Sequence, residues 1–170
     1  MKNTITDSEF KHLEGIEYFD FEEDFMEHNI RCIPMIVRFK MDAVGIKLKL
    51  AEWSKFTKEE RVNLALMPAV DMDSMDLYHK YLLELVVKHT GNLPTMMPIN
   101  AHPDWKELKA IPSRLLIAIH SLNISFELSQ WQKLTTLQRF ALMKLCKSGH
   151  ENKNLPKAFN EFGLINHSIN

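Results

Sequence analysis

The chain has 170 residues, which is enough for one domain or two small ones. It is 45% hydrophobic and 25% charged with a net charge of −1, a composition typical of globular proteins and unlike that of basic nucleic-acid-binding proteins. No apolar run approaches the roughly 18 residues that span a membrane, and the N-terminus lacks the apolar segment of a secretion signal, so we expect a cytoplasmic protein that binds neither nucleic acid nor membrane.

Residues 1–30 form an acidic arm. There are nine acidic residues and one lysine between Asp7 and Glu27, whereas the stretch from Arg31 to Lys49 has five basic residues and one acid. The simplest interpretation is that the arm lies on the basic face of the following helix through individually weak ion pairs. Alternatively, the uneven charge marks a docking surface for a partner.

Residues 33–67 are predicted to form a helix, a turn, a short helix and another helix. Pro34 favours the start of a helix, and Gly45 tolerates the left-handed conformation that ends one. The stretch from Thr57 to Glu60 has the form of a capping box, in which two side chains bind amides at a helix start. Residues 37–41 also alternate in polarity, but no hairpin partner follows, so a strand there is disfavoured.

A long helix is predicted over residues 74–90 because apolar residues recur there at helical spacing. Asp71 or Asp73 can cap its start, and Gly91 can end it. A proline-rich loop then covers residues 92–110. Loops of this length inside a compact domain often have a function.

Residues 111–147 repeat residues 33–67 at an offset of 78, with nine identities over the 32 positions from 33 to 64. Self-similarity at a fixed offset is typical of a repeated helical unit. It also favours a helix over residues 37–41, whose counterpart is strongly helical. The predicted fold is therefore all-α: a single helical domain over residues 1–170, in which two tandem repeats pack about a pseudo-twofold axis. Two small lobes joined by a linker are the alternative. The aligned pairs include Trp53 with Trp131, Arg61 with Arg139, and Gly45 with Asn123.

The candidate functional residues are those that the repeat does not copy. A thiol beside an arginine, as in Arg31-Cys32, can have a lowered pKa, although burial would cancel this. The loop containing His150 and Glu151 opens the C-terminal segment 148–164, which ends in a short helix that Asn154 is expected to cap.

His28 and Cys32 are four residues apart and could share a helical face, but no further metal ligand follows at a defined spacing. The only other cysteine is Cys146, and both thiols are expected to be reduced. The common catalytic signatures are absent from the sequence. We therefore assign no catalytic residue, no metal and no cofactor.

Several short motifs, in the same order along the chain, resemble those of the nitrate reductase-associated protein family. The resemblance extends over residues 21–164, with two departures: Cys146 stands where serine is usual and Leu155 where phenylalanine is expected. The matching stretches are Arg31 to Met35, Arg38 to Lys40, Gly45 to Leu50, Glu52-Trp53, Gln138 to Leu142, His150 to Asn154 and Glu161 to Leu164.

This resemblance implies an accessory factor that is associated with assimilatory nitrate reductase, a molybdenum and iron–sulfur enzyme, and is needed for its activity. We expect a non-enzymatic protein that supports assembly, maturation or activity of its partner, nitrate reductase, through protein–protein interaction. The alternatives are a metal or cofactor carrier that uses Cys32, His28 or His150, and an enzyme with an unrecognised site. The candidate partner-binding residues are Arg31, Cys32, His150, Glu151, Asn152 and Asn154.

Overall fold

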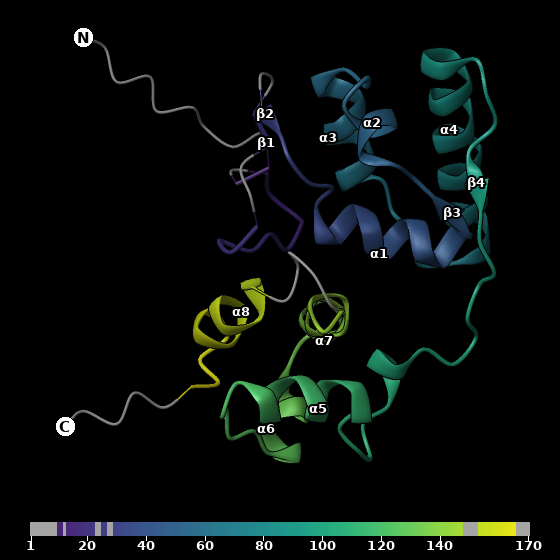
Figure 1. The fold of residues 1–170 in the computed structure, drawn as a ribbon. Coiled ribbons are helices and arrows are strands. Elements are labelled where there is room, and N and C mark those ends of the chain that lie inside the picture. Colours follow the sequence, from purple (N-terminus) through teal and green to yellow (C-terminus); the bar gives the residue numbers. More distant parts are fainter. Residues whose placement is uncertain (1–9, 12, 23–24, 27–28, 148–152, 166–170) are drawn as a thin grey trace, which may run out of the picture. The chain divides into compact units, whose positions relative to one another are not determined.

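The structure is a computed structural model that describes residues 10–11, 13–22, 25–26, 29–147 and 153–165 (Figure 1). The fold is mainly helical, as the sequence predicts. The chain divides into two compact units: unit 1 comprises residues 1–18 and 22–100, and unit 2 comprises residues 19–21 and 101–170. The main division falls inside the predicted proline-rich loop. The organisation of both units as one domain stays a prediction.

The helices of unit 1 begin and end at residues whose local chemistry explains the boundary. Pro34 precedes α1, and Gly45 ends it with a φ of 71°. The capping box expected at Thr57 is present at the start of α3. The side chain of Asp71 accepts a hydrogen bond from the amide of Ser74, so α4 starts slightly before the predicted helix. The bounds are Met35–Val44 for α1, Leu50–Trp53 for α2, Lys58–Leu66 for α3 and Met72–Thr90 for α4.

Two short strand pairs, which the all-α prediction misses, accompany the helices. Antiparallel pairs form between β1 (Phe25–Met26) and β2 (Asn29–Ile30), and between β3 (Ile46–Lys47) and β4 (Thr95–Met96). The second pair forms because the left-handed turn at Gly45 redirects the chain out of α1. The first part of the predicted loop 92–110 is thereby fixed beside β3, next to α4 (Figure 1).

The core of unit 1 holds α1, α3 and α4 together. Trp53, Leu64 and Tyr78 are fully buried, and the hydroxyl of Tyr78 donates to the carbonyl of Leu64 at 3.0 Å. The buried ammonium of Lys40 on α1 donates to two carbonyls at the end of α3, those of Ala65 and Met67. Burial lowers the pKa of Lys40 to about 8. These contacts fix α1, α3 and α4 against one another, and the loop that follows α4 lies beside them.

Unit 2 contains three helices that begin with the same kinds of local features as the helices of unit 1. Its helices α5, α6 and α7 begin 78 residues after α1, α2 and α3. Asn123 has a φ of 53°, at the position that corresponds to Gly45. The bounds are Asp104–Lys106 for the 3-10 helix η1, Ser113–Ser121 for α5, Leu128–Lys133 for α6, Thr136–Leu145 for α7 and Leu155–Glu161 for α8.

The two buried arginines make matching contacts in their own units. Arg61 donates from Nη1 to the carbonyl of Phe56 at 2.6 Å, and Arg139 donates from Nη1 to the carbonyl of Leu134 at 2.5 Å. Arg139 also lies over the ring of Trp131, 5.9 Å from its centroid. The arginines and tryptophans are therefore part of the architecture in both units.

The described part of the acidic arm is divided between the units. The carboxylate of Glu161 accepts hydrogen bonds from the amides of Asp20 and Phe21 in unit 2, at 2.8 and 3.0 Å. In unit 1 the carboxylate of Glu22 accepts from the amide of Met35, the first residue of α1. Negative charge is favoured at a helix N-terminus. Pairing of the arm with the basic face of α1 stays a prediction.

Candidate functional site

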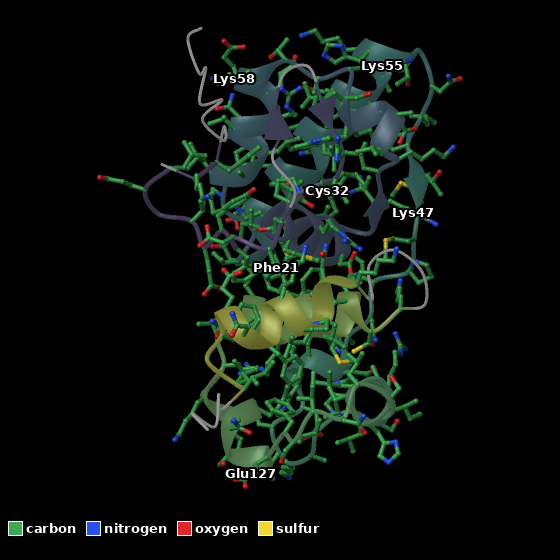
Figure 2. All side chains as sticks on the ribbon, turned by 60° about the vertical axis from the view of Figure 1, so that its left-hand side comes forward. Phe21, Cys32, Lys47, Lys55, Lys58 and Glu127 are labelled. Atoms are coloured by element: carbon green, nitrogen blue, oxygen red, sulfur yellow. The ribbon has the colours of Figure 1, made fainter. Side chains whose placement is uncertain are left out.

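The two predicted residues at the start of the first repeat differ in their surroundings. Arg31 is exposed, whereas Cys32 is partly buried and packs against the core of unit 1. In the view of Figure 2, Cys32 lies towards the middle of unit 1, while the exposed Lys55 and Lys58 lie at its margin. This placement fits the role of a small buried hydrophobe better than that of a reactive thiol.

The second cysteine is also tied into the fold. Cys146 is partly buried, and its thiol donates to the carbonyl of Leu142 at 2.9 Å. Burial raises the pKa of this thiol to about 12. Because the thiolate is the reactive form, Cys146 is inert at neutral pH.

The predicted polar loop falls largely outside the described residues, which include neither His150, Glu151 and Asn152 nor His28. Asn154 is described, and its side chain makes no capping hydrogen bond at the start of α8. Asn154 therefore occupies the expected N-cap position of α8, but it does not cap the helix with its side chain. Pro156 stands in the first turn instead, where its fixed φ suits a helix.

A groove in unit 1 gathers side chains that the sequence analysis did not single out. It has a volume of about 380 Å³ and contains four of the ten methionines of the chain. We call it the methionine groove. Its lining comes from the end of α1, one face of α4 and the chain around β4: Ala43, Val44, Gly45, Met72, Met75, Asp76, His79, Met96, Met97 and Ile99.

Helical spacing on α4 builds one wall of the groove. Met72, Met75, Asp76 and His79 are separated by three, one and three residues, so they lie on the same face of the helix. The opposite wall is the segment that follows β4. This segment is held by the β3–β4 pair, in which Lys47, labelled in Figure 2, pairs with Thr95, and by a 2.9 Å hydrogen bond from the amide of Met97 to the carbonyl of Gly45.

Gly45 lets the two walls approach each other. A Cβ atom at this position would lie 2.9 Å from the carbonyl oxygen of Met97 and 3.0 Å from Cγ1 of Ile99. Real Cβ contacts are almost never that short, and the φ of 71° is itself unfavourable for residues other than glycine. The groove therefore depends on the absence of a side chain at the end of α1.

One polar group of the groove has a defined orientation. Nδ1 of His79 lies 3.0 Å from the carbonyl oxygen of Val44. Because a carbonyl can only accept, Nδ1 carries the hydrogen, and Nε2 of the neutral ring has a free lone pair. Within the described ranges, no hydrogen bond to Nε2 is formed. His79 therefore offers the groove one nitrogen that can accept a hydrogen bond or bind a metal.

The groove exposes large apolar side chains. The exposed fractions are 85% for Met72, 56% for Met96 and 62% for Ile99. Apolar side chains that gather at a hollow are typical of a binding surface, and flexible thioethers adapt well to a partner. In the sequence, the groove is indicated only by the spacing of Met72, Met75 and His79. The same spacing is equally typical of the apolar stripe of an ordinary helix.

A second polar cluster joins α3 to α4. The carboxylate of Glu60 accepts hydrogen bonds from Lys88 Nζ and His89 Nε2, both at 2.7 Å, and from the amide of Thr57 at 2.8 Å. Burial alone would raise the pKa of Glu60, but these donors outweigh it and lower the pKa to about 2. The cluster is a cross-link between two helices, and it predicts a specific pH dependence.

Glu60→Gln should make unfolding less dependent on acid. A carboxyl whose folded pKa of about 2 lies below its ordinary value of 4.5 contributes stability above pH 4.5, and this contribution is lost as the pH falls towards 2. We expect the variant to be about 1–3 kcal/mol less stable at pH 7 and to lose less stability than the wild type on acidification. Urea unfolding at pH 7 and at pH 3 measures both quantities.

Glu59→Gln is the matched control, because Glu59 is exposed in the same helical turn. Its stability should stay within about 0.5 kcal/mol of the wild type at pH 7. Identical acid sensitivity in the Glu60 variant and the wild type would show that the cross-link contributes nothing.

Among the residues that the structure describes, no helix combines the length and the apolar character needed to cross a membrane. In the same ranges, no three histidine, cysteine, aspartate or glutamate side chains come together as a metal-binding group. A family model described as conserved nitrate reductase-associated protein matches residues 18–162. No curated protein and no solved structure matches the chain.

Proposed function

Because the chain belongs to the nitrate reductase-associated protein family, we propose that it is a non-enzymatic accessory factor that binds assimilatory nitrate reductase in the cytoplasm. It supports the assembly, maturation or activity of the enzyme through protein–protein contact. The family match supports the association with the reductase. The methionine groove supports the mode of action, because it offers a surface suited to holding a partner.

The groove has the size and chemistry to hold a few apolar side chains of a partner. Its volume of about 380 Å³ falls in the range of small binding pockets. Side chains that enter such a hollow provide much of the binding energy of protein interfaces. Met72, Met96 and Ile99 would lose their exposed apolar surface on binding, which favours the complex.

Groups that could perform acid–base chemistry have structural tasks in unit 1. Lys40 closes the end of α3, and Glu60 joins α3 to α4 through His89. These tasks support a binding role over a catalytic one. The alternative of a carrier centred on Cys32 has less support, because this thiol packs against the core.

The proposed architecture includes two tandem copies of one helical unit. The common offset of three helix starts and the matching contacts of Arg61 and Arg139 support the duplication. The copies also differ. Trp131 donates from its indole to the carbonyl of Glu107 at 2.7 Å, whereas Nε1 of Trp53 has no acceptor in the described part of the chain. Most of the methionine groove lies outside the first copy, since α4 and β4 follow it and only the end of α1 belongs to it.

Co-purification with nitrate reductase tests the proposed function. A tagged form of the chain should retain the reductase at micromolar concentrations, and a strain that lacks the chain should have reduced reductase activity. Crosslinks should map to the methionine groove. Crosslinks at Arg31 or at residues 150–154 would instead favour the second candidate surface. Absence of a complex together with normal reductase activity in the deletion strain would refute the proposal.

A further inference from the structure

We propose that the methionine groove is a binding site for a soft monovalent metal ion, Cu(I), held by Nε2 of His79 and the thioethers of Met75 and Met97. The exposed Met72 and Met96 complete the site from its rim. The inference goes beyond the accessory role and does not depend on it.

The donor set suits Cu(I). Thioether sulfur is a soft, neutral ligand that prefers Cu(I) to harder ions, and imidazole binds copper as well. Met75, His79 and Met97 are partly buried, whereas Met72 and Met96 are 85% and 56% exposed. We assign the three partly buried donors to an inner set, and the two exposed thioethers can close over it. Low coordination numbers of this kind suit an ion with a filled d shell.

The hydrogen bond of His79 is of the kind made by metal-binding histidines. Such histidines usually donate their second ring nitrogen to a carbonyl or carboxylate, which fixes the ring and the tautomer. Here Nδ1 donates to the carbonyl of Val44 at 3.0 Å, at the end of α1. Met75 stands one helical turn before His79 on the same face of α4. Nε2 and the Met75 side chain are thus directed to one side of the helix.

Harder metals find fewer suitable ligands in the groove. Zinc sites use thiolates, imidazoles and carboxylates, and magnesium and calcium sites use oxygen ligands. The groove contains one imidazole and one carboxylate, that of Asp76, and neither Cys32 nor Cys146 belongs to its lining. Asp76 can balance the single positive charge of Cu(I). The soft thioether ligands of the site therefore favour Cu(I) over these harder metal ions.

Anaerobic Cu(I) titration of the full chain tests this inference. The background is Cys32→Ser with Cys146→Ser, which removes thiols that would compete for the metal. With the ion kept reduced and in competition with a chromophoric Cu(I) chelator, we expect one tightly bound equivalent. Ag(I), a redox-inert substitute, should shift the NMR methyl signals of the groove methionines and the ring signals of His79.

Substitutions that keep the apolar volume identify the ligands. Met75→Leu and Met97→Leu should each weaken Cu(I) binding by at least about 10-fold, because each removes a thioether ligand and even outer-shell changes typically cost this much. Met143→Leu is the control, because this methionine is buried in α7 of unit 2, and its affinity should equal that of the background protein. Thermal unfolding checks that all variants fold, as leucine-for-methionine exchanges are usually tolerated.

Three results would overturn the inference. They are failure of the background protein to retain Cu(I), equal affinity in the groove variants and the Met143→Leu control, and binding of Zn²⁺ as tight as that of Cu(I). Reductase binding is a separate readout. Because the Cu(I) titration uses the chain alone, without the reductase, loss of the metal and loss of the partner are distinguishable.

Discussion

Replacing Gly45 with alanine should destabilise the protein by about 2–5 kcal/mol, which is a large share of the stability of a small protein. Two independent costs add up. A left-handed backbone costs residues with a Cβ atom about 1–2 kcal/mol, and overpacking costs about 1–3 kcal/mol more. The second cost arises because the new Cβ would lie 2.9 Å from the carbonyl oxygen of Met97, a backbone atom that cannot turn aside.

Gly91→Ala separates the two costs. Gly91 ends α4 with a φ of 72°, close to the 71° of Gly45, but a Cβ atom there would meet nothing within 4 Å. This variant should lose only about 1–2 kcal/mol. Urea unfolding of the two variants and the wild type measures the difference. Equal losses at both positions would mean that the segment after β4 yields freely, and that the groove wall is not fixed by the end of α1.

Local chemistry explains which parts of the fold can be predicted from the sequence. Pro34, Gly45 and Thr57 act on their immediate neighbours, so the ends of α1 and the start of α3 can be placed before any tertiary contact is known. Gly91 likewise places the end of α4, whereas the sequence leaves Asp71 and Asp73 as alternative caps for its start and the structure shows Asp71. The offset of 78 residues in the sequence also places α5, α6 and α7 of unit 2, because Pro112 and Thr135 stand where Pro34 and Thr57 stand in unit 1.

The strands and the groove could not be predicted because they depend on contacts between distant segments. The β3–β4 pair joins residues on either side of α4, so the sequence contains no hairpin turn that would predict this pairing. The groove combines the end of α1, a face of α4 and the chain after β4. Seen alone, Met72 and Met75 fit the apolar stripe of a helix, and Met96 and Met97 fit a loop.

The motifs that carry the family resemblance did not identify a binding surface. Lys40 and Gly45 belong to these motifs, yet Lys40 closes the end of α3 and Gly45 permits a close backbone approach. Cys32 packs against the core, and the Asn154 side chain does not cap α8. Residues that make the family recognisable here largely support the fold. Arg31 is exposed and stays a candidate contact residue.

Ile99→Glu should weaken binding to nitrate reductase by at least about 30-fold. This side chain is 62% exposed at the groove, so the free protein should tolerate the change. In the complex the new carboxylate would be buried against apolar side chains of the partner without a counter-charge. Burying an unpaired charge and losing an apolar anchor together cost at least about 2 kcal/mol, which corresponds to this factor.

Leu77→Glu is the matched control for this change. Leu77 is also 62% exposed, and it lies on α4 itself. Helical geometry places it away from the face that carries Met72, Met75 and His79, and it does not line the groove. Both variants introduce the same charge into the same unit, so a general electrostatic effect on the reductase would appear equally in the two.

The most direct test of the proposed role is the dissociation constant of the complex with purified nitrate reductase, measured by calorimetry for the wild type and these two variants. We predict that the wild type and Leu77→Glu bind with similar affinity and that Ile99→Glu binds at least about 30-fold more weakly. Equal affinity of all three proteins would contradict the assignment of the methionine groove as the docking surface.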